Sequence, residues 1–353
     1  MKWKIMWLIL LCAVAGIHGC MGGSKTAKTV PPTPRTIPPT TKIATPVTEP
    51  VIRAVTAPAN VNHAAAGESR RSRGNNRSRG SGRGGQSSNP SSLSKNELWQ
   101  LTEELLSLDT GINQPTIREQ GKTSAKSTQD SANNPLFESV PRSALNKDTV
   151  RLMKQLLDNY YPDVGRSEVR SASEQTEENR FLDALMQTPL MQRLEGFLQE
   201  KNLISHGLRQ TLEDIWFTLY SRKGGKLGSS GYEHVFIGEL KGGKVSGFHN
   251  WLNFRKEELE GDLNYMGYMR VVDLNGKGKV IKLRFNWLNK PKPVGSIFVG
   301  TTPELEIALY TLCFLAKPNA NCPVKLAGKK FSIQTWTSNI SGKTVIGSAY
   351  PNI

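Results

Sequence analysis

Two histidines stand fifteen residues apart in the second half of the sequence, in the segments 233–236 and 247–251. They are His234 and His249, and after residue 94 the sequence contains only one other histidine. Histidine is the side chain whose ordinary pKa lets it both accept and donate a proton near neutral pH. The pair therefore predicts acid–base chemistry.

Cleavage of RNA by its own 2′-hydroxyl needs two proton carriers and a cation. A base removes the proton of the 2′-hydroxyl, an acid protonates the departing 5′-oxygen, and a cation stabilises the charge of the phosphorane-like transition state. His234 and His249 suit the first two tasks. Lys292 suits the third because Pro291 and Pro293 would fix its loop, although composition alone favours an ordinary surface lysine.

Two other chemistries fit the histidines less well. A zinc site needs further ligands, and no third ligand stands at a recognisable zinc spacing from the pair. A Ser-His-Asp hydrolase of the nucleophile-elbow kind carries a Gly-x-Ser-x-Gly segment, which the sequence lacks. Transesterification is the interpretation that uses both histidines.

A predicted hairpin determines where the two histidines lie. Residues Lys241–Lys244 contain two adjacent glycines, the pattern of a two-residue hairpin turn. In that register His249 lies diagonal to His234 on one face, with backbones about 7 to 8 Å apart, so that two imidazoles flank one phosphate. The same register places Glu233 and Glu239 on the opposite face, and a slip of one residue would reverse this.

The first 94 residues do not predict a folded domain. Lys2 and Lys4 precede an apolar run over 5–17, so residues 1–19 are predicted to be a secretory signal peptide, too short for a stable membrane span. Residues 20–94 are rich in Thr, Pro, Ser, Gly and Arg, which predicts a disordered arm. We therefore expect a secreted protein with no membrane segment after signal removal.

The charge of the chain is concentrated in that arm. The 353 residues carry a formal charge of +16, of which residues 1–94 supply +11, with 13 Lys or Arg against two acids. Arginines alternating with Ser and Gly over 70–83 are common in polyanion-binding segments, and a solvated linker is the equal alternative. The folded part must therefore bind RNA through a site and not through bulk charge.

Cysteines and glycosylation triplets leave two questions open. Cys313 and Cys322 lie nine residues apart, and in a secreted protein they could form a disulfide. Because Cys313 falls in an apolar helix pattern, a buried free thiol is the alternative. Asn76 and Asn339 each begin an N-x-S triplet and are candidate glycosylation sites.

Helices are predicted mainly before residue 221 and strands after it. The spacing of apolar residues predicts helices that start at Glu97, with Ser94 or Asn96 as a cap, and then near 147–160, 173–187, 189–200 and 207–220. Residues 110–145 are polar and rich in turn formers, which predicts an irregular excursion.

Strands are predicted over 232–240, 244–248, 266–274, 279–286, 295–300, 323–336 and 344–349. Two helices interrupt them, one near 250–260 and one capped by Thr302 with Pro303 at its first position. The order predicts an α+β fold, an N-terminal helical lobe followed by mostly antiparallel β-sheets with helices.

Five segments follow one another in order after residue 227. They are Gly228–Glu239, Ser246–Trp251, Lys292–Ser296, Gly300–Glu306 and Ala349–Pro351. Together they resemble the ordered motifs of the EndoU (XendoU-type) uridylate-specific endoribonucleases. The resemblance runs from about residue 95 to the last residue, so it implies one EndoU-like domain over 95–353.

The resemblance assigns the chemistry that the histidines suggest. It implies His234 as general acid, His249 as general base and Lys292 as the group that stabilises the phosphate. The expected products are a 2′,3′-cyclic phosphate and a 5′-hydroxyl. The expected function is that of a secreted endoribonuclease that cuts single-stranded RNA at uridylates.

Substrate-binding residues follow from the same resemblance. It implicates Ser296 and Tyr350 in holding the uracil and ribose, and it adds Thr302 from the fourth motif. A hydroxyl donor and a flat aromatic surface suit a pyrimidine. For Tyr350, a packed aromatic near the end of the domain is the alternative interpretation.

A divalent cation is the cofactor that the resemblance implies, manganese in the first place and calcium in the second. Glu233 and Glu239 match acidic positions of the family, and carboxylates suit such cations. The partner is expected to be uridine-containing single-stranded RNA, and the protein a monomer. The alternatives are a non-catalytic RNA- or polyanion-binding protein and a phosphodiesterase that uses metal-activated water.

Overall fold

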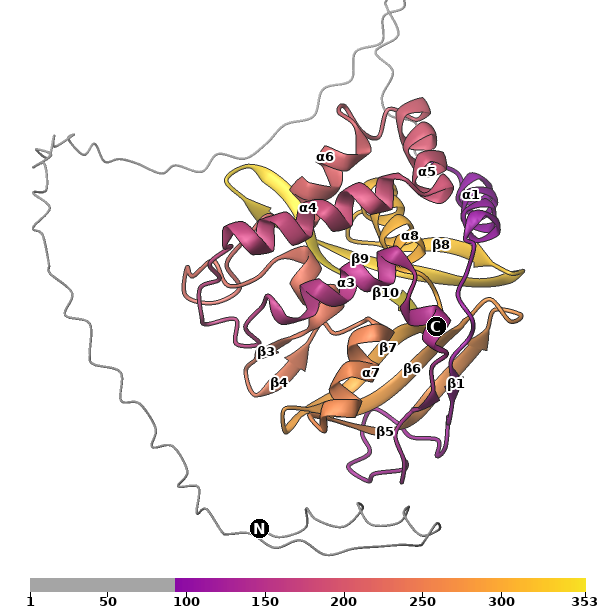
Figure 1. Cartoon of the computed structure of the whole chain (residues 1–353), viewed down its shortest axis with the longest axis vertical. Helices are drawn as coiled ribbons and strands as arrows, with labels where there is room; N and C mark the ends of the chain where they lie inside the picture. The colour runs from indigo at the N-terminus through magenta and orange to yellow at the C-terminus, as the bar shows by residue number, and fades with distance from the viewer. Residues whose placement is uncertain (1–92) are drawn as a thin grey trace, which may run out of the picture. The chain divides into compact units, whose positions relative to one another are not determined.

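The computed structural model describes residues 93–353, the coloured ribbon of Figure 1. The predicted signal peptide and the predicted arm as far as residue 92 lie outside the described residues. Helices come first and antiparallel strands follow, so the α+β prediction is confirmed. Within residues 93–353 no helix is both long and apolar enough to cross a membrane.

The first part of the described chain is a helical lobe, and its helices begin where the sequence supplies caps. Ser94 and Glu97 form a capping box at α1, and Ser171 and Glu174 form another at α4. The predicted excursion over 110–145 contains only short β1 (Thr116–Ile117), β2 (Phe137–Ser139) and α2 (Arg142–Leu145). The other elements of the lobe are α1 (Lys95–Leu108), α3 (Asp148–Gln155), η1 (Leu156–Asp158), α4 (Ala172–Met186), α5 (Pro189–Glu200), α6 (Leu208–Leu212) and η2 (Glu213–Phe217).

Two three-stranded antiparallel sheets form most of the second half, in the orders β5-β6-β7 and β10-β9-β8. The single strand predicted over 323–336 is wrong, because Ala327 and Gly328, with φ of 48° and 78°, form a turn that divides it. The strands are β5 (Leu263–Asp273), β6 (Lys279–Trp287), β7 (Lys290–Val299), β8 (Asn321–Leu326), β9 (Lys329–Ile340) and β10 (Lys343–Asn352).

The hairpin predicted around the glycine pair is present, but it is shorter than expected. β3 (Glu239–Lys241) pairs with β4 (Lys244–Ser246) in the predicted register. The strand predicted over 232–240 is wrong in its first part, which forms a π-helical turn, η3 (Glu233–Ile237). Gly238 ends this turn with a φ of 99°, in the region that favours glycine.

Helices α7 and α8 connect these sheets to each other and to the lobe. α7 (Trp251–Glu260) lies against the β5-β6-β7 sheet in the lower part of Figure 1. α8 (Pro303–Ala316) is buried from Pro303 to Phe314 and packs against α1, α3 and α5 on one side and β9 and β10 on the other. A disulfide between Cys313 and Cys322 ties its last turn to β8, which answers the question that the sequence left open.

Candidate active site

One pocket of about 580 Å³ brings distant segments of the chain together. His234, His249, Lys292, Ser296 and Tyr350 all line it. These side chains come from η3, from the segment before α7, from β7 and from β10. The first four are buried, and each of the two histidines is 5% exposed. Five of the residues that the sequence singled out therefore share one cavity.

A carboxylate orients His234. The Nδ1 atom of His234 lies 2.7 Å from Oε2 of Glu239, whose side chain is fully buried. The prediction that Glu239 faces away is wrong, because β3 begins only at Glu239 and the turn η3 brings His234 back to it. Since the carboxylate accepts the proton on Nδ1, Nε2 is the ring nitrogen that is left for chemistry.

Arg222 and Ser229 hold Glu239 in place. Nε of Arg222 lies 3.1 Å from Oε1 of Glu239, and the Ser229 hydroxyl donates to the same oxygen. Burial acts to raise the pKa of Glu239, but His234, Arg222 and Ser229 together leave this pKa below its ordinary value. Burial also lowers the pKa of His234, although Glu239 acts in the opposite direction. Glu239 is therefore an ionised partner of His234 at neutral pH.

A backbone carbonyl and an aromatic ring fix His249. Its Nδ1 donates to the carbonyl oxygen of Ser296 at 2.8 Å. The ring of Tyr350 stacks on its imidazole, with centroids 5.0 Å apart and planes inclined by 22°. Burial, reinforced by the positive charge of Lys292, lowers the pKa of His249 well below its ordinary value. At pH 7 the imidazole is neutral, and its Nε2 is a proton acceptor.

Lys292 belongs to strand β7, so the prediction of a loop fixed by prolines is wrong. β7 is the last strand of its sheet, and an edge strand tolerates Pro291 and Pro293 because its outer N–H groups need no partner. The Lys292 ammonium donates to the carbonyl oxygen of Gly247 at 2.6 Å. Burial lowers the pKa of Lys292 to about 8, so the side chain is mainly charged at pH 7.

Gly247 allows the two histidine-bearing segments to touch. The N–H of Phe248 donates to the carbonyl of His234 at 2.9 Å, and that of His249 donates to Val235 at 2.6 Å. A Cβ at Gly247 would lie 1.8 Å from the carbonyl oxygen of His234, and the φ of Gly247 is 65°. Only glycine fits there, so this close approach sets the spacing of the histidines in place of the predicted strand pairing.

Thr302 does not line the pocket, so the structure does not bring it together with Ser296 and Tyr350, the other residues predicted to bind substrate. Thr302 is fully buried, and its hydroxyl accepts the hydrogen bond that caps α8. The fourth motif contacts the segment that carries His249. Glu306 accepts a hydrogen bond from Thr301 at 2.7 Å and one from Asn250 at 3.4 Å. Asn250 directly follows His249 and caps α7.

Glu233 and Glu239 do not fit a divalent cation. The oxygens of Glu239 already accept hydrogen bonds, while Glu233 is fully buried with neither oxygen paired. Burial raises the pKa of Glu233 to about 10, and a neutral carboxylic acid is a poor ligand for manganese or calcium. Within residues 93–353, the acidic group that could hold a cation is Glu257, Glu260 and Asp262, whose ligand atoms lie within 4.8 Å of one another.

Among the pocket residues that were not predicted from the sequence, three have charged or aromatic side chains. Arg222 lies beside Glu239, and Lys282 faces Ser296 across the β6–β7 pairing. Trp336 is 48% exposed on β9. Lys282 could have been found only with the strand register known, and nothing in the sequence around Trp336 distinguishes it from a core aromatic.

A neutral imidazole, a second imidazole paired with a carboxylate, and a lysine are the groups that general acid–base catalysis on an anionic substrate requires. The arrangement therefore suits an enzyme that works by acid–base catalysis. A family model described as "Endoribonuclease XendoU" matches residues 97–351. The chain belongs to this endoribonuclease family.

Individual relatives agree with this assignment. A "Uridylate-specific endoribonuclease" of Bos taurus is 37% identical over 281 residues, which are 76% of this chain and 68% of that protein. The "Uridylate-specific endoribonuclease B" of Danio rerio is 39% identical over 273 residues, 72% of this chain and 95% of that one.

A solved structure shows the same fold. It is described as "The structure of XendoU: a splicing independent snoRNA processing endoribonuclease", and it is 33% identical to this chain with a TM-score of 0.61. The match covers 72% of this chain and 96% of that one.

Proposed function

We propose that this protein is an endoribonuclease that cleaves single-stranded RNA at uridylates by transesterification. One observation carries the proposal: two imidazoles with different hydrogen-bond partners share a pocket with Lys292. The family assignment supports it, as do the relatives whose names carry the same specificity.

The hydrogen-bond partner of each Nδ1 atom assigns the base role to His249 and the acid role to His234 in this proposal. Because Nδ1 of His249 donates to Ser296, the Nε2 lone pair takes the proton of the 2′-hydroxyl as the 2′-oxygen attacks phosphorus. As the bond from phosphorus to the 5′-oxygen breaks, Nε2 of a protonated His234 donates its proton to that oxygen. Glu239 stabilises the imidazolium that this step requires. The products are a 2′,3′-cyclic phosphate and a 5′-hydroxyl.

Lys292 supplies the cation, and Ser296 and Tyr350 bind the nucleoside. The charged ammonium of Lys292 stabilises the negative charge that builds up on the phosphate oxygens. One face of the Tyr350 ring lies on His249, so we place the uracil on its other face and the Ser296 hydroxyl at a uracil oxygen.

A divalent cation, manganese or calcium, remains part of the proposal through the family resemblance. Glu233 and Glu239 do not fit it, so no step of the reaction passes through the ion. The ligand atoms of Glu257, Glu260 and Asp262 lie close enough to hold an ion, but Lys256 pairs with both glutamates and Trp287 donates to Glu257, so an ion would have to displace these partners.

The cellular setting of the proposal comes from the sequence. Residues 1–19 direct secretion, the arm over 20–94 adds affinity for RNA without sequence preference, and the mature protein is a monomer with no membrane segment. Of the two candidate glycosylation sites, Asn339 is exposed, while Asn76 lies outside the described residues.

The test is cleavage of an oligonucleotide that contains a single uridine, with identification of the 3′ end of the product. We expect a 2′,3′-cyclic phosphate with the wild type and at least a 100-fold slower reaction for His234→Ala or His249→Ala. A 3′- or 5′-phosphate as the first product would instead indicate metal-activated water. Binding without cleavage would indicate a polyanion-binding protein.

A further inference from the structure

Two identical four-residue turns flank the His234 segment, and the proposed reaction uses neither. The sequence Lys-Gly-Gly-Lys occurs at 223–226 and again at 241–244. All four glycines have positive φ, 62° and 75° in the first turn and 58° and 76° in the second. In both turns the two lysines pair directly across from each other. The chain therefore builds the same lysine-bearing turn twice, and we call each a lysine tip.

The arrangement of charge in the lysine tips is unfavourable in the free protein. Like charges placed directly opposite each other across two strands repel, and a tight glycine turn does not require lysine on either side. All four lysines are exposed, and an added Cβ at any of the four glycines would meet no atom within 4 Å. Within residues 93–353 none of these lysines forms an ion pair. An anion from outside the domain would relieve the repulsion in both tips.

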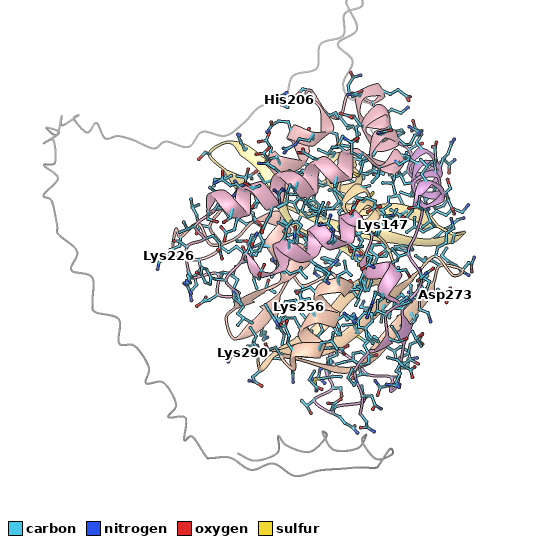
Figure 2. The ribbon with its side chains drawn as sticks, viewed as in Figure 1. Lys147, His206, Lys226, Lys256, Asp273 and Lys290 are labelled. Carbon is cyan, nitrogen blue, oxygen red and sulfur yellow. A yellow bond between two sulfur atoms is a disulfide. The ribbon has the colours of Figure 1, made fainter. Side chains whose placement is uncertain are left out.

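Each lysine tip lies within two residues of a residue that lines the active-site pocket. Arg222, directly before the first tip, and Ser246, two residues after the second, line the pocket. The bases of the tips are joined, because Nε of Arg222 donates to Ser229 at 2.8 Å and to Glu239 at 3.1 Å. Figure 2 shows Lys226 of the first tip at the outer left edge of the domain. The two tips are thus fixed relative to His234, the partner of Glu239.

We propose that the two lysine tips bind phosphates of the RNA strand that extends beyond the nucleotide held in the pocket. This inference rests on the proposed function and adds to it a binding surface for the flanking strand. Lysine is a compact point charge that contacts phosphate without reading the base. The tips therefore add affinity for long substrates and no sequence preference, and they contribute nothing to a substrate too short to reach them.

The experiment compares two pairs of substitutions, made in the full chain, with a matched control. The variants are Lys223→Gln with Lys226→Gln, and Lys241→Gln with Lys244→Gln. The control, Lys126→Gln with Lys154→Gln, removes the same charge from two exposed lysines that do not line the pocket. The value of kcat/KM is measured against salt concentration for a dinucleotide with a 5′ uridine and for a 12-nucleotide strand with one central uridine.

For the long strand, we expect each tip variant to flatten the plot of log kcat/KM against log salt concentration by about 1.4, since each phosphate contact with a single strand contributes about 0.7. Cleavage of the dinucleotide should remain at the wild-type rate. If the control flattens the plot as much as the tip variants, only net charge matters and the inference is overturned. Slower cleavage of the dinucleotide would also overturn it, because the tips would then act by holding His234 in place.

A second measurement separates this inference from the proposed function. The same strand with 2′-deoxyuridine cannot undergo transesterification, so its binding reports contact without chemistry. Weaker binding by the tip variants at low salt, with the control unchanged, supports the inference that the lysine tips bind RNA, even if the wild type fails to cleave it. Equal binding by all variants overturns this inference even if the wild type cleaves RNA as proposed. Tip variants that lose binding to anionic lipid vesicles but not to this strand would also overturn the inference.

Discussion

The imidazole of His249 and the ring of Tyr350 are stacked, with centroids 5.0 Å apart and planes inclined by 22°. The residue proposed to bind the uracil therefore also supports the proposed base. Tyr350 packs one face against His249 while it lines the pocket. A change at this position should affect both binding and the chemical step.

Two substitutions of Tyr350 distinguish the contribution of its aromatic ring from that of its hydroxyl. We expect Tyr350→Ala to lower kcat/KM on a uridine oligonucleotide by about 10- to 100-fold, since stacking on one base contributes about 1–3 kcal/mol. Tyr350→Phe keeps both ring faces and should stay close to the wild type. Equal losses in the two variants would show that the hydroxyl matters and not the stacking.

Glu239 and Glu233 provide a matched pair of substitutions. Glu239→Gln removes the negative charge beside His234 and should lower kcat by about 100-fold, within the usual range for general acid–base catalysis. Glu233→Gln replaces a carboxylic acid that is already neutral at pH 7, because burial raises the pKa of Glu233 to about 10, and should leave kcat nearly unchanged.

Titration of the Glu239→Gln and Glu233→Gln variants with manganese and with calcium checks whether either carboxyl group is a metal ligand. Because neither carboxyl group fits a cation, both variants should bind the ion as the wild type does. A loss of ion binding in Glu233→Gln would show that Glu233 is ionised and acts as a ligand after all.

The pH dependence of cleavage follows from the directions of the pKa shifts. His249 acts as a base only when neutral, and its pKa is lowered well below 6.5 by burial, so the acid limb should lie below pH 6.5. Lys292 acts only when charged, and burial lowers its pKa to about 8, so activity should fall as the pH rises through 8. The protonated His234 needed as acid is lost at a lower pH than the charge of Lys292, because burial lowers the pKa of His234 below its ordinary value of 6.5.

We therefore expect a bell-shaped profile of kcat/KM with its maximum below pH 6.5, and a further loss of activity as Lys292 titrates. Lys292→Arg keeps its charge at alkaline pH. Above pH 8 its rate should fall less steeply than that of the wild type, whatever its absolute rate. A rate that rises steadily through pH 9 in the wild type would contradict the assignment of both groups.

The disulfide between Cys313 and Cys322 should contribute to stability more than to catalysis. It ties α8 to β8, and closing a loop of this size stabilises a fold by about 2–3 kcal/mol in the chain-entropy account. We expect Cys313→Ser with Cys322→Ser to lower the free energy of unfolding in urea by that amount, with kcat unchanged at 25 °C. Reduction of the wild type should reproduce the loss, and a double variant as stable as the oxidised wild type would contradict the expectation.

Local signals in the sequence predicted the elements that carry their own start and stop residues. Caps at Ser94 and Thr302 predicted two helices close to their observed bounds, and the glycine pair predicted the register of β3 with β4. The strand predicted for the segment around His234 was wrong, because η3 depends on contacts with residues that lie more than ten positions further along the chain. The carbonyl of His234 accepts from Phe248, and Gly247 lets the two segments approach.

Long-range pairing explains the other errors at the site. Pro291 and Pro293 make Lys292 resemble a loop residue, yet β6 holds this segment as an edge strand. Glu239 lies beside His234 only because the strand begins late. The residues of the site could thus be named from motifs, while their orientation depended on η3 and on sheet register, which no local pattern encodes.

The π-helical turn at η3 makes the site sensitive to chain length as well as to residue type. A π-helical turn holds one residue more than an α-helical turn. Deletion of one residue from Val235–Ile237 would let the segment relax to α-helical geometry, and His234 would rotate by about 100° relative to the residues that follow. The imidazole would then leave Glu239 and the pocket although no pocket side chain had been replaced, so the length of this segment, and not only its residue types, keeps His234 in place.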